Sequence, residues 1–336
     1  MASDNTVRLD MDTPIGFVGA GRLGTSLAAA LHAGGFRVVA VTSRSTPSSE
    51  AFAERVPGCA PVAKPQDVAD IAGAVFITTP DADIEVTCDG ISWRNEQAAI
   101  HCSGVLPLSK LASAHESGAR TGGLHLLQTF PNRDSADLIT GASAAVGSDD
   151  PALLDWLQKT AYAIGAKPFT IHDENRAAYH ASAVMACGLV AALMGLAADM
   201  WKEMGVSRAD ALVALRPLTA ATVDGVGREG LPAAFTGPAV RGDVETIRMH
   251  LDATARHSPE MAHAYASLTI DAMSLFAEHE GLSPEARKEI EVLLRRSLES
   301  GGTPDGTPRA SGVSGTAGKT SAASDFKTTE NEGDSI

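Results

Sequence analysis

Three polar side chains in this sequence are candidates for donating a proton to a small substrate: His125, His180 and Ser103. Imidazole titrates close to neutral pH, and a hydroxyl both donates and accepts hydrogen bonds. No serine-elbow, Walker or HExxH motif accompanies them, so hydrolysis by a nucleophile, phosphate transfer and zinc proteolysis lack support. The chemistry that remains is proton donation beside a hydride carrier. We favour His180 as the donor, with Tyr179 as the alternative donor, and expect Ser103 and His125 to line the nicotinamide side. Gln128 is expected to contact substrate beside His125, and the alternative is that the histidines are buried and structural.

The hydride carrier is indicated by residues 15–28, IGFVGAGRLGTSLA, where an apolar strand runs into three glycines and a helix start. Gly19 permits a tight turn, Gly21 lets the backbone approach a pyrophosphate, and Gly24 lets the helix pack closely against the strand. This order is typical of a dinucleotide-binding turn. The cofactor contacts predicted in the turn are Gly19, Ala20, Gly21, Arg22, Leu23 and Gly24.

The residue type at the end of the next strand indicates whether such a fold prefers NAD or NADP. Folds that prefer NAD usually place an acidic residue there, about 20 residues after the glycines. This chain has Ser43 and Arg44 instead, within FRVVAVTSRS at 36–45. A guanidinium and hydroxyls suit a 2′-phosphate, so we predict NADP(H) in preference to NAD(H). The alternative is that Arg44 is only a solvated loop residue.

Alternating strand and helix patterns surround these residues in the first half of the chain. Strands are predicted at 13–18, 36–42, 73–79, 97–102, 122–127 and 142–147, with helices at 22–34, 47–55, 66–71, 82–89 and 107–115 between them. This order predicts a doubly wound parallel sheet, whose ligands bind beyond the carboxyl ends of the strands. Thr79, Pro80 and Ser103 follow strands, and we predict that they contact the cofactor.

From about residue 150 helical patterns replace strands, at 151–164, 173–204, 207–225, 241–254, 258–279 and 284–298. We predict a flexible N-terminus over 1–11, a cofactor domain over 12–149 and a helical substrate and dimerisation domain over 150–298. A disordered tail over 299–336 follows, because its Gly, Ser, Thr and Pro cannot form a core. In the helical half, the polar cluster Thr236, Arg241 and Asp243 is predicted to bind substrate, with a local Arg241–Asp243 pair as the alternative.

Composition restricts the class of partner. The formal net charge of −14 disfavours nucleic acid and anionic membranes. Four dispersed cysteines and the absence of an apolar leader at the N-terminus predict a cytoplasmic protein without a metal site or disulfide framework. The uncharged run at 181–198 approaches the length of a membrane span, but its many small residues favour a buried helix or a subunit interface.

Six short motifs, in order, resemble a family of Rossmann-like proteins with a C-terminal domain of unknown function, DUF2520. They are GAGRLG at 19–24, TPDADI at 79–84, HCSG at 101–104, LHLLQTFP at 124–131, YHASAV at 179–184 and FTGPAVRGD at 235–243. The family is similar in layout to pyrroline-5-carboxylate reductase, deazaflavin-dependent NADP reductase and β-hydroxyacid dehydrogenases. The resemblance therefore implies a helical domain like that of 6-phosphogluconate dehydrogenase, and a homodimer formed through the helix at 173–204.

The sequence also departs from these relatives. Gly188 stands where they commonly have asparagine, and Leu126 where they have proline. The β-hydroxyacid dehydrogenases rely on a lysine and an asparagine of their long helix, whereas this helix has no lysine between Asp173 and Trp201, which is why His180 is proposed as the donor. We predict an NADPH-dependent reductase of a small carbonyl or imine compound, with a non-catalytic NADP-binding sensor as the alternative.

Overall fold

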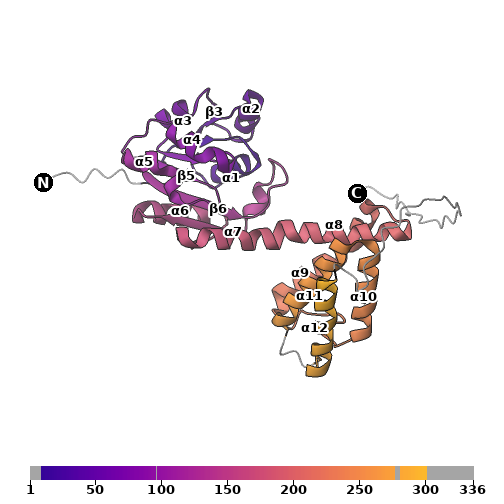
Figure 1. Ribbon diagram of the computed structural model, residues 1–336. Helices are drawn as coiled ribbons and strands as arrows, with labels where there is room; N and C mark the ends of the chain where they lie inside the picture. Colours follow the sequence, from indigo (N-terminus) through magenta and orange to yellow (C-terminus); the bar gives the residue numbers. More distant parts are fainter. Residues whose placement is uncertain (1–8, 96, 277–280, 301–336) are drawn as a thin grey trace. The chain divides into compact units, whose positions relative to one another are not determined.

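The computed structural model describes residues 9–95, 97–276 and 281–300, and the predicted tail lies almost entirely outside this range. The chain forms two compact units, Met1–Leu193 and Met194–Ile336. The first holds the β-sheet and the second holds a group of helices (Figure 1).

The first unit is built on an eight-stranded sheet of order β3-β2-β1-β4-β5-β6-β7-β8. Neighbouring strands are parallel, except that β6 and β7 run antiparallel. This confirms the predicted α/β fold with a doubly wound, largely parallel sheet. The strands are β1 Ile15–Val18, β2 Val38–Thr42, β3 Ala60–Pro61, β4 Ala74–Ile77, β5 Ala98–His101, β6 Arg120–Leu127, β7 Ser143–Ser148 and β8 Lys167–Thr170.

Helices cover both faces of the sheet, so the central strands are buried on both sides. Phe17 and Phe76 stack at 5.3 Å on the face covered by α1 and α6, whereas Val75 and Ile77 pack on the opposite face against α3 and α4. Two covered faces explain the nearly continuous apolar strands. The helices are α1 Arg22–Ala33, α2 Thr46–Arg55, α3 Pro65–Ile71, α4 Ile84–Asp89, α5 Ala112–Glu116 and α6 Pro151–Ala163, with short 3₁₀ turns η1 Asp81–Asp83, η2 Leu108–Leu111 and η3 Ala136–Ile139.

The sheet continues past residue 149, where composition placed the domain boundary. Strand β8 pairs with β7 in parallel, and the first compact unit ends at Leu193. Three of the four residues of β8 are exposed, so the strand lacks the apolar alternation that would reveal it. The two-residue strand β3 was missed for the same reason, because both of its residues are exposed.

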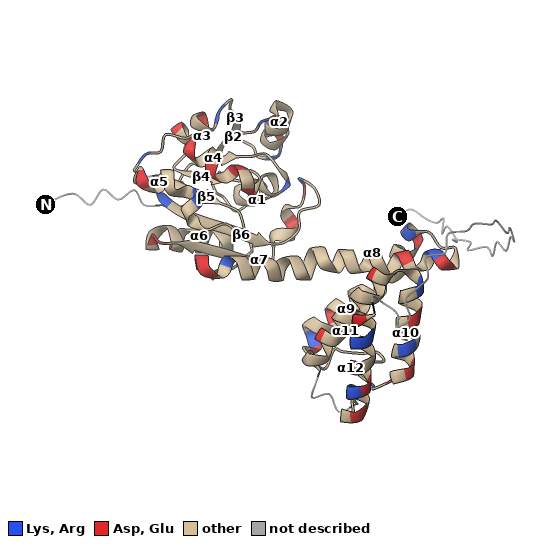
Figure 2. Ribbon diagram, viewed as in Figure 1, with Lys and Arg blue, Asp and Glu red and all other residues tan. Residues whose placement is uncertain are grey.

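The long helix predicted at 173–204 is present as one helical stretch, Asp173–Met204, with local changes in its winding. Its parts are η4 Asp173–Asn175, α7 Arg176–Val184, the π-helical turn η5 Met185–Leu189, α8 Val190–Met200 and η6 Trp201–Met204. Figure 2 shows the uncharged middle of this helix. It is long and apolar enough to cross a membrane, a test that interface helices of water-soluble proteins also pass, and 6% of its most apolar window is buried among the described residues. The prediction of a helix buried within the chain is therefore wrong, whereas its burial in a subunit interface stays a prediction.

The second unit is helical within its described residues, as predicted. Its helices are α9 Arg208–Glu229, α10 Val244–His257, α11 Pro259–Leu275 and α12 Pro284–Glu299. Each begins at an N-cap whose side chain accepts a backbone N–H three residues later, and these caps are Ser207, Asp243, Ser258 and Ser283. Ile247, Leu251, Ile290 and Leu294 form part of its buried core.

Candidate functional site

The three glycines of the turn occupy three different environments. Gly19 has a φ of 119°, and a Cβ there would lie 2.7 Å from the carbonyl carbon of Thr78. A Cβ at Gly24 would lie 2.6 Å from the Thr78 hydroxyl oxygen, so both positions require glycine to pack against this residue. A Cβ at Gly21 would meet no heavy atom within 4 Å. The open space beside Gly21 is what a pyrophosphate approaching the backbone needs.

A cavity of about 610 Å³ opens beside this turn, at the carboxyl ends of β1, β2 and β4. Most of the predicted cofactor contacts line it: Gly19, Ala20, Gly21, Ser43, Arg44, Thr79 and Pro80. Arg22, Leu23 and Gly24 form the first turn of α1. The hydroxyl oxygen of Thr79 is buried and has no hydrogen-bond partner among the described residues. A buried polar atom at a cavity wall is a site for a ligand contact.

The predicted arginine at the end of β2 has an acidic neighbour. Nη1 of Arg44 lies 3.5 Å from Oδ2 of Asp83, and both side chains are largely exposed. The Ser43 hydroxyl accepts a hydrogen bond from the backbone N–H of Ser45 at 3.3 Å. Asp83 belongs to the TPDADI motif, but nothing in its spacing along the chain predicts that it lies beside Arg44.

Sequence reasoning missed a second arginine in this cavity, Arg133. It lies in the connection between β6 and β7, and its side chain reaches the glycine turn and the first turn of α2. No local motif marks it, because its position depends on contacts between residues far apart in the chain. Ser48, its partner in α2, also lines the cavity and was not predicted.

The two predicted catalytic histidines meet at Gly104. A Cβ on this glycine would lie 2.9 Å from both Nε2 of His125 and Nδ1 of His180, and the two ring centroids are 6.0 Å apart. His125 lies on β6 and His180 on α7. Both rings line a second cavity of about 560 Å³, which Gln128 and Gly188 also border. The structure therefore brings together the two histidines among the three residues proposed for catalysis.

A phenol fixes one of these rings. Nδ1 of His125 lies 2.7 Å from the hydroxyl of Tyr179, and the two rings meet edge to face. Burial lowers the pKa of His125 to about 4, and the neighbouring His180 adds to this effect. Burial also raises the pKa of Tyr179 to about 12. Both groups are therefore neutral at neutral pH, and the direction of their hydrogen bond depends on the tautomer of the imidazole. A phenol that donates to Nδ1 leaves the imidazole proton on Nε2.

Beneath these rings lies a fully buried arginine, Arg176, whose Nε donates to Oδ1 of Asp173 at 2.7 Å. A Cβ on Gly123 would lie 2.9 Å from its Nη2, and a Cβ on Gly147 would lie 2.8 Å from the same atom. The two glycines therefore leave the space that the guanidinium fills. The adjacent His101 is also completely buried, and burial together with Arg176 lowers its pKa to about 3. His101 is therefore neutral and shielded from the cavities.

Ser103 and Gln128 are already engaged in local hydrogen bonds. The Ser103 hydroxyl donates to Oδ2 of Asp81 at 2.8 Å and accepts the backbone N–H groups of Val105 and Leu106. The Gln128 amide donates to the carbonyl oxygen of Leu138 at 3.1 Å. Their contacts with cofactor and substrate stay predictions.

The remaining predicted residues belong to the second unit. Asp243 caps α10, accepting from the backbone N–H of Thr246 at 3.1 Å and from its hydroxyl at 2.7 Å. These hydrogen bonds lower the pKa of Asp243. Arg241 and Thr236 are exposed, and the nearby charge of Arg241 contributes to the lowered pKa of Asp243, although no ion pair within 4.0 Å is described between them. The role of the three residues in substrate binding stays a prediction.

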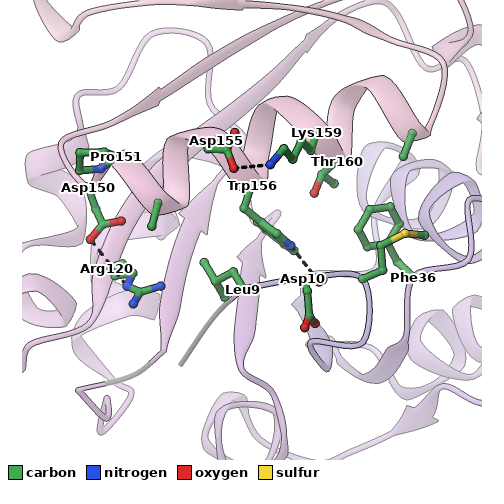
Figure 3. Close-up of a pocket in the computed structure, with 13 residues that line it drawn as sticks. Leu9, Asp10, Phe36, Arg120, Asp150, Pro151, Asp155, Trp156, Lys159 and Thr160 are labelled. Atoms are coloured by element: carbon green, nitrogen blue, oxygen red, sulfur yellow. Dashed lines mark hydrogen bonds and ion pairs between the residues drawn. The ribbon is translucent and has the colours of Figure 1, made fainter. Parts of the chain in front are cut away.

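A third cavity, of about 820 Å³, is a poorer candidate (Figure 3). It lies beside α6, with Phe36 just before β2 and Arg120 at the start of β6, away from the strand ends where α/β sheets bind ligands. Four of its charged side chains form ion pairs with one another: Lys159 with Asp155 at 2.7 Å, and Arg120 with Asp150 at 3.6 Å. Among the described residues, no three His, Cys, Asp or Glu side chains form a group that could hold a metal ion.

Two family models match this chain, one over its N-terminal part and one over the mostly helical part that follows. Residues 3–126 match a Rossmann-like domain, and residues 143–272 match a domain of unknown function, DUF2520. The chain joins a Rossmann-like domain to a DUF2520 domain. The candidate site of this Rossmann–DUF2520 protein draws on both matches, because His125 lies in the first and Tyr179 and His180 lie in the second.

Solved structures of nicotinamide-dependent reductases resemble this Rossmann–DUF2520 protein. A Bacteroides fragilis protein named as a candidate NADP oxidoreductase has 25% identity and a TM-score of 0.64, over 80% of this chain and 99% of its own. An imine reductase from Myxococcus stipitatus with NADP⁺ has 16% identity and a TM-score of 0.57, over 82% and 99%. The 1-pyrroline-5-carboxylate reductase of Streptococcus pyogenes has 16% identity and a TM-score of 0.55, over 78% and 98%.

A variant of the Myxococcus enzyme was solved with NAD⁺, so these neighbours include complexes with either nicotinamide cofactor. The comparison with curated proteins gave no match. At these identities the neighbours establish the fold of the Rossmann–DUF2520 protein, and its chemistry has to be argued from its own residues.

Proposed function

We propose that this protein is an NADPH-dependent reductase of a small carbonyl or imine compound. The observation that carries the proposal is the convergence of His125 and His180 at Gly104, on the same sheet edge as the glycine turn and its cavity. The similarity to solved NADP-binding oxidoreductases supports the same class of reaction.

The residues of the nucleotide cavity fit NADPH. Gly21 leaves open space for the pyrophosphate, and Thr79 offers a buried hydroxyl without a partner. Ser43 and Arg44 would bind the 2′-phosphate, whose charge complements a guanidinium. The bound cofactor would supply the hydride, while this chain's residues orient the substrate and move the proton.

We assign different roles to the two histidines. His125 is neutral, and with Tyr179 donating to its Nδ1 it would carry its proton on Nε2 and donate a hydrogen bond to the carbonyl oxygen or imine nitrogen as negative charge develops there. His180 borders the same cavity and delivers the proton, with its Nδ1 facing Gly104. Tyr179 is a positioning residue, because it acts through the ring of His125.

The test is NADPH oxidation by the full-length chain with a panel of small aldehydes, ketones and cyclic imines. Turnover that falls about 100-fold or more in His180→Ala, with NADPH affinity unchanged, supports the reductase and its donor. Undiminished turnover in that variant contradicts the donor assignment. If NADPH binds tightly and no member of the panel reacts, the protein is instead the sensor that the sequence left as the alternative.

We further propose that the helix at 173–204 forms a homodimer in the cytoplasm. Val184, Met185, Leu189 and Leu193 of this helix are 43%, 64%, 50% and 42% exposed, and apolar surface of this kind is usually covered by a partner. The neighbouring alanines and glycines allow a second helix to approach closely. A Leu189→Glu variant should be monomeric by light scattering where the unaltered protein is dimeric. A requirement for detergent would instead indicate a membrane segment.

A further inference from the structure

Arg133 connects two parts of the nucleotide cavity that are far apart in sequence. Its Nε donates to the carbonyl oxygen of Ala20 in the glycine turn at 3.2 Å, and its Nη2 donates to the hydroxyl of Ser48 in α2 at 3.1 Å. The residue is 113 positions from Ala20 and lines the cavity with Ser43 and Arg44. Its guanidinium therefore lies between the glycine turn and the first turn of α2.

The backbone around Arg133 is fastened to the neighbouring helices. The Ser26 hydroxyl of α1 donates to the Arg133 carbonyl oxygen at 3.4 Å, and Arg22 donates to the carbonyl oxygen of Pro131 at 3.3 Å. Arg55 at the end of α2 makes two hydrogen bonds to Asp134, at 2.7 and 3.3 Å. These contacts hold the guanidinium in place before a ligand arrives, and such preorganisation favours binding.

Charge explains why a second cation is needed at this site. Arg44 already lies against Asp83, which partly compensates its charge, and the whole chain has a net charge of −14. Arg133 has no carboxylate partner among the described ion pairs, so its charge remains available to an anion. The hydroxyl of Ser48 adds a hydrogen-bonding group beside it.

We propose that Arg133 is a second arginine that binds the 2′-phosphate of the cofactor and, with Arg44 and Ser48, selects NADPH over NADH. The inference rests on the proposed function, because it assumes that the cavity binds a nicotinamide dinucleotide. Ser48 places the guanidinium at the start of α2, the helix that follows the ribose-binding end of β2. The contact is charge-assisted, and an arginine can make it with two nitrogens.

The test measures dissociation constants for NADPH and NADH with the full-length chain, by calorimetry. Arg133→Gln keeps an amide donor but removes the charge, and we expect it to weaken NADPH at least about tenfold and NADH less than about twofold. The pair 2′,5′-ADP and 5′-AMP isolates the 2′-phosphate, and only the first should lose affinity. Arg55→Ala is the matched control, because Arg55 fastens the same loop without lining the cavity.

Each outcome decides the matter. Equal losses for NADPH and NADH in Arg133→Gln would assign the arginine to another part of the cofactor and overturn the proposal. Equal losses in Arg133→Gln and Arg55→Ala would show that only the order of the loop matters, and would overturn it as well. If the unaltered protein binds neither dinucleotide, the proposed function itself fails. Should Arg133→Gln unfold, Arg133→Lys in the same assays replaces it, with a smaller selective loss of NADPH affinity expected.

Discussion

The hydroxyl of Tyr179 lies 2.7 Å from Nδ1 of His125, and this contact joins the long helix to the sheet at the candidate site. Tyr179 is on α7 and His125 on β6, 54 positions apart. The phenol keeps its proton because burial raises its pKa to about 12. When it donates to Nδ1, the neutral imidazole carries its proton on Nε2, the nitrogen that lies beside Gly104.

Replacing Tyr179 by phenylalanine keeps the ring contacts and removes only this hydrogen bond. We expect kcat to fall about tenfold and KM to change little, because one hydrogen bond that orients a catalytic group contributes about 1 kcal/mol or somewhat more. Nitrogen NMR of the imidazole should show a mixture of tautomers in place of one. A variant with full kcat and one unchanged tautomer would remove Tyr179 from the positioning role.

The stability of the first unit should depend on pH through its buried histidines. Burial lowers the pKa of His125 to about 4 and that of His101 to about 3, whereas the unfolded chain titrates near the ordinary value of 6.5. Between these values the unfolded state binds protons that the folded state excludes. The free energy of unfolding should therefore be highest above about pH 6.5 and fall by up to about 1.4 kcal/mol per pH unit for each histidine as the pH decreases towards 4.

Urea denaturation at about pH 7.5 and about pH 5 measures this difference. A His125→Asn variant should lose part of the pH dependence, because it removes one of the two excluded protons. His180, Asp81 and Arg176 also influence the charge of His125, so the slope belongs to the group of residues. A slope unchanged by the substitution would assign the pH dependence elsewhere.

Alanine in place of the first glycine of the turn should lower stability, whereas alanine in place of the second should weaken cofactor binding. Gly19→Ala places a Cβ 2.7 Å from the Thr78 backbone at a φ of 119°, so we expect a loss of stability of about 2 kcal/mol or more. Gly21→Ala meets no protein atom and should leave thermal stability within about 0.5 kcal/mol. It should nevertheless weaken NADPH binding about tenfold or more, because the methyl group enters the space of the pyrophosphate.

Thermal unfolding and NADPH titration of the two variants separate these effects. If Gly21→Ala binds NADPH as tightly as the unaltered protein, the cavity beside the turn does not hold the pyrophosphate. Gly188→Ala, in the other cavity, is a suitable control because its Cβ would meet only Val184, at 3.9 Å.

The sequence predicted those parts of the site that depend on local order. The glycine turn, the polar residues after strands and the histidine of the long helix are all recognisable from spacing along the chain. Arg133 and Arg176 were not predicted, because arginine is normally exposed and nothing near either residue signals a partner. Arg133 is positioned by its hydrogen bonds to Ala20 and Ser48. Arg176 is positioned by the space that Gly123 and Gly147 leave open. Such contacts arise only when distant segments pack.

Arg176 gives the last prediction, because its buried guanidinium supports the helix that presents Tyr179 and His180. Arg176→Ala should cost about 3–5 kcal/mol, since it opens a cavity and removes the cation that pairs with Asp173, which among the described contacts keeps only the backbone N–H of Leu108. Arg176→Met refills the volume and should cost less. Lys159→Ala breaks an ion pair of the same 2.7 Å length on the exposed face of α6, and should cost under about 0.5 kcal/mol. Urea unfolding measures all three variants, and similar losses for Arg176→Ala and Lys159→Ala would show that the buried pair contributes no more than a surface one.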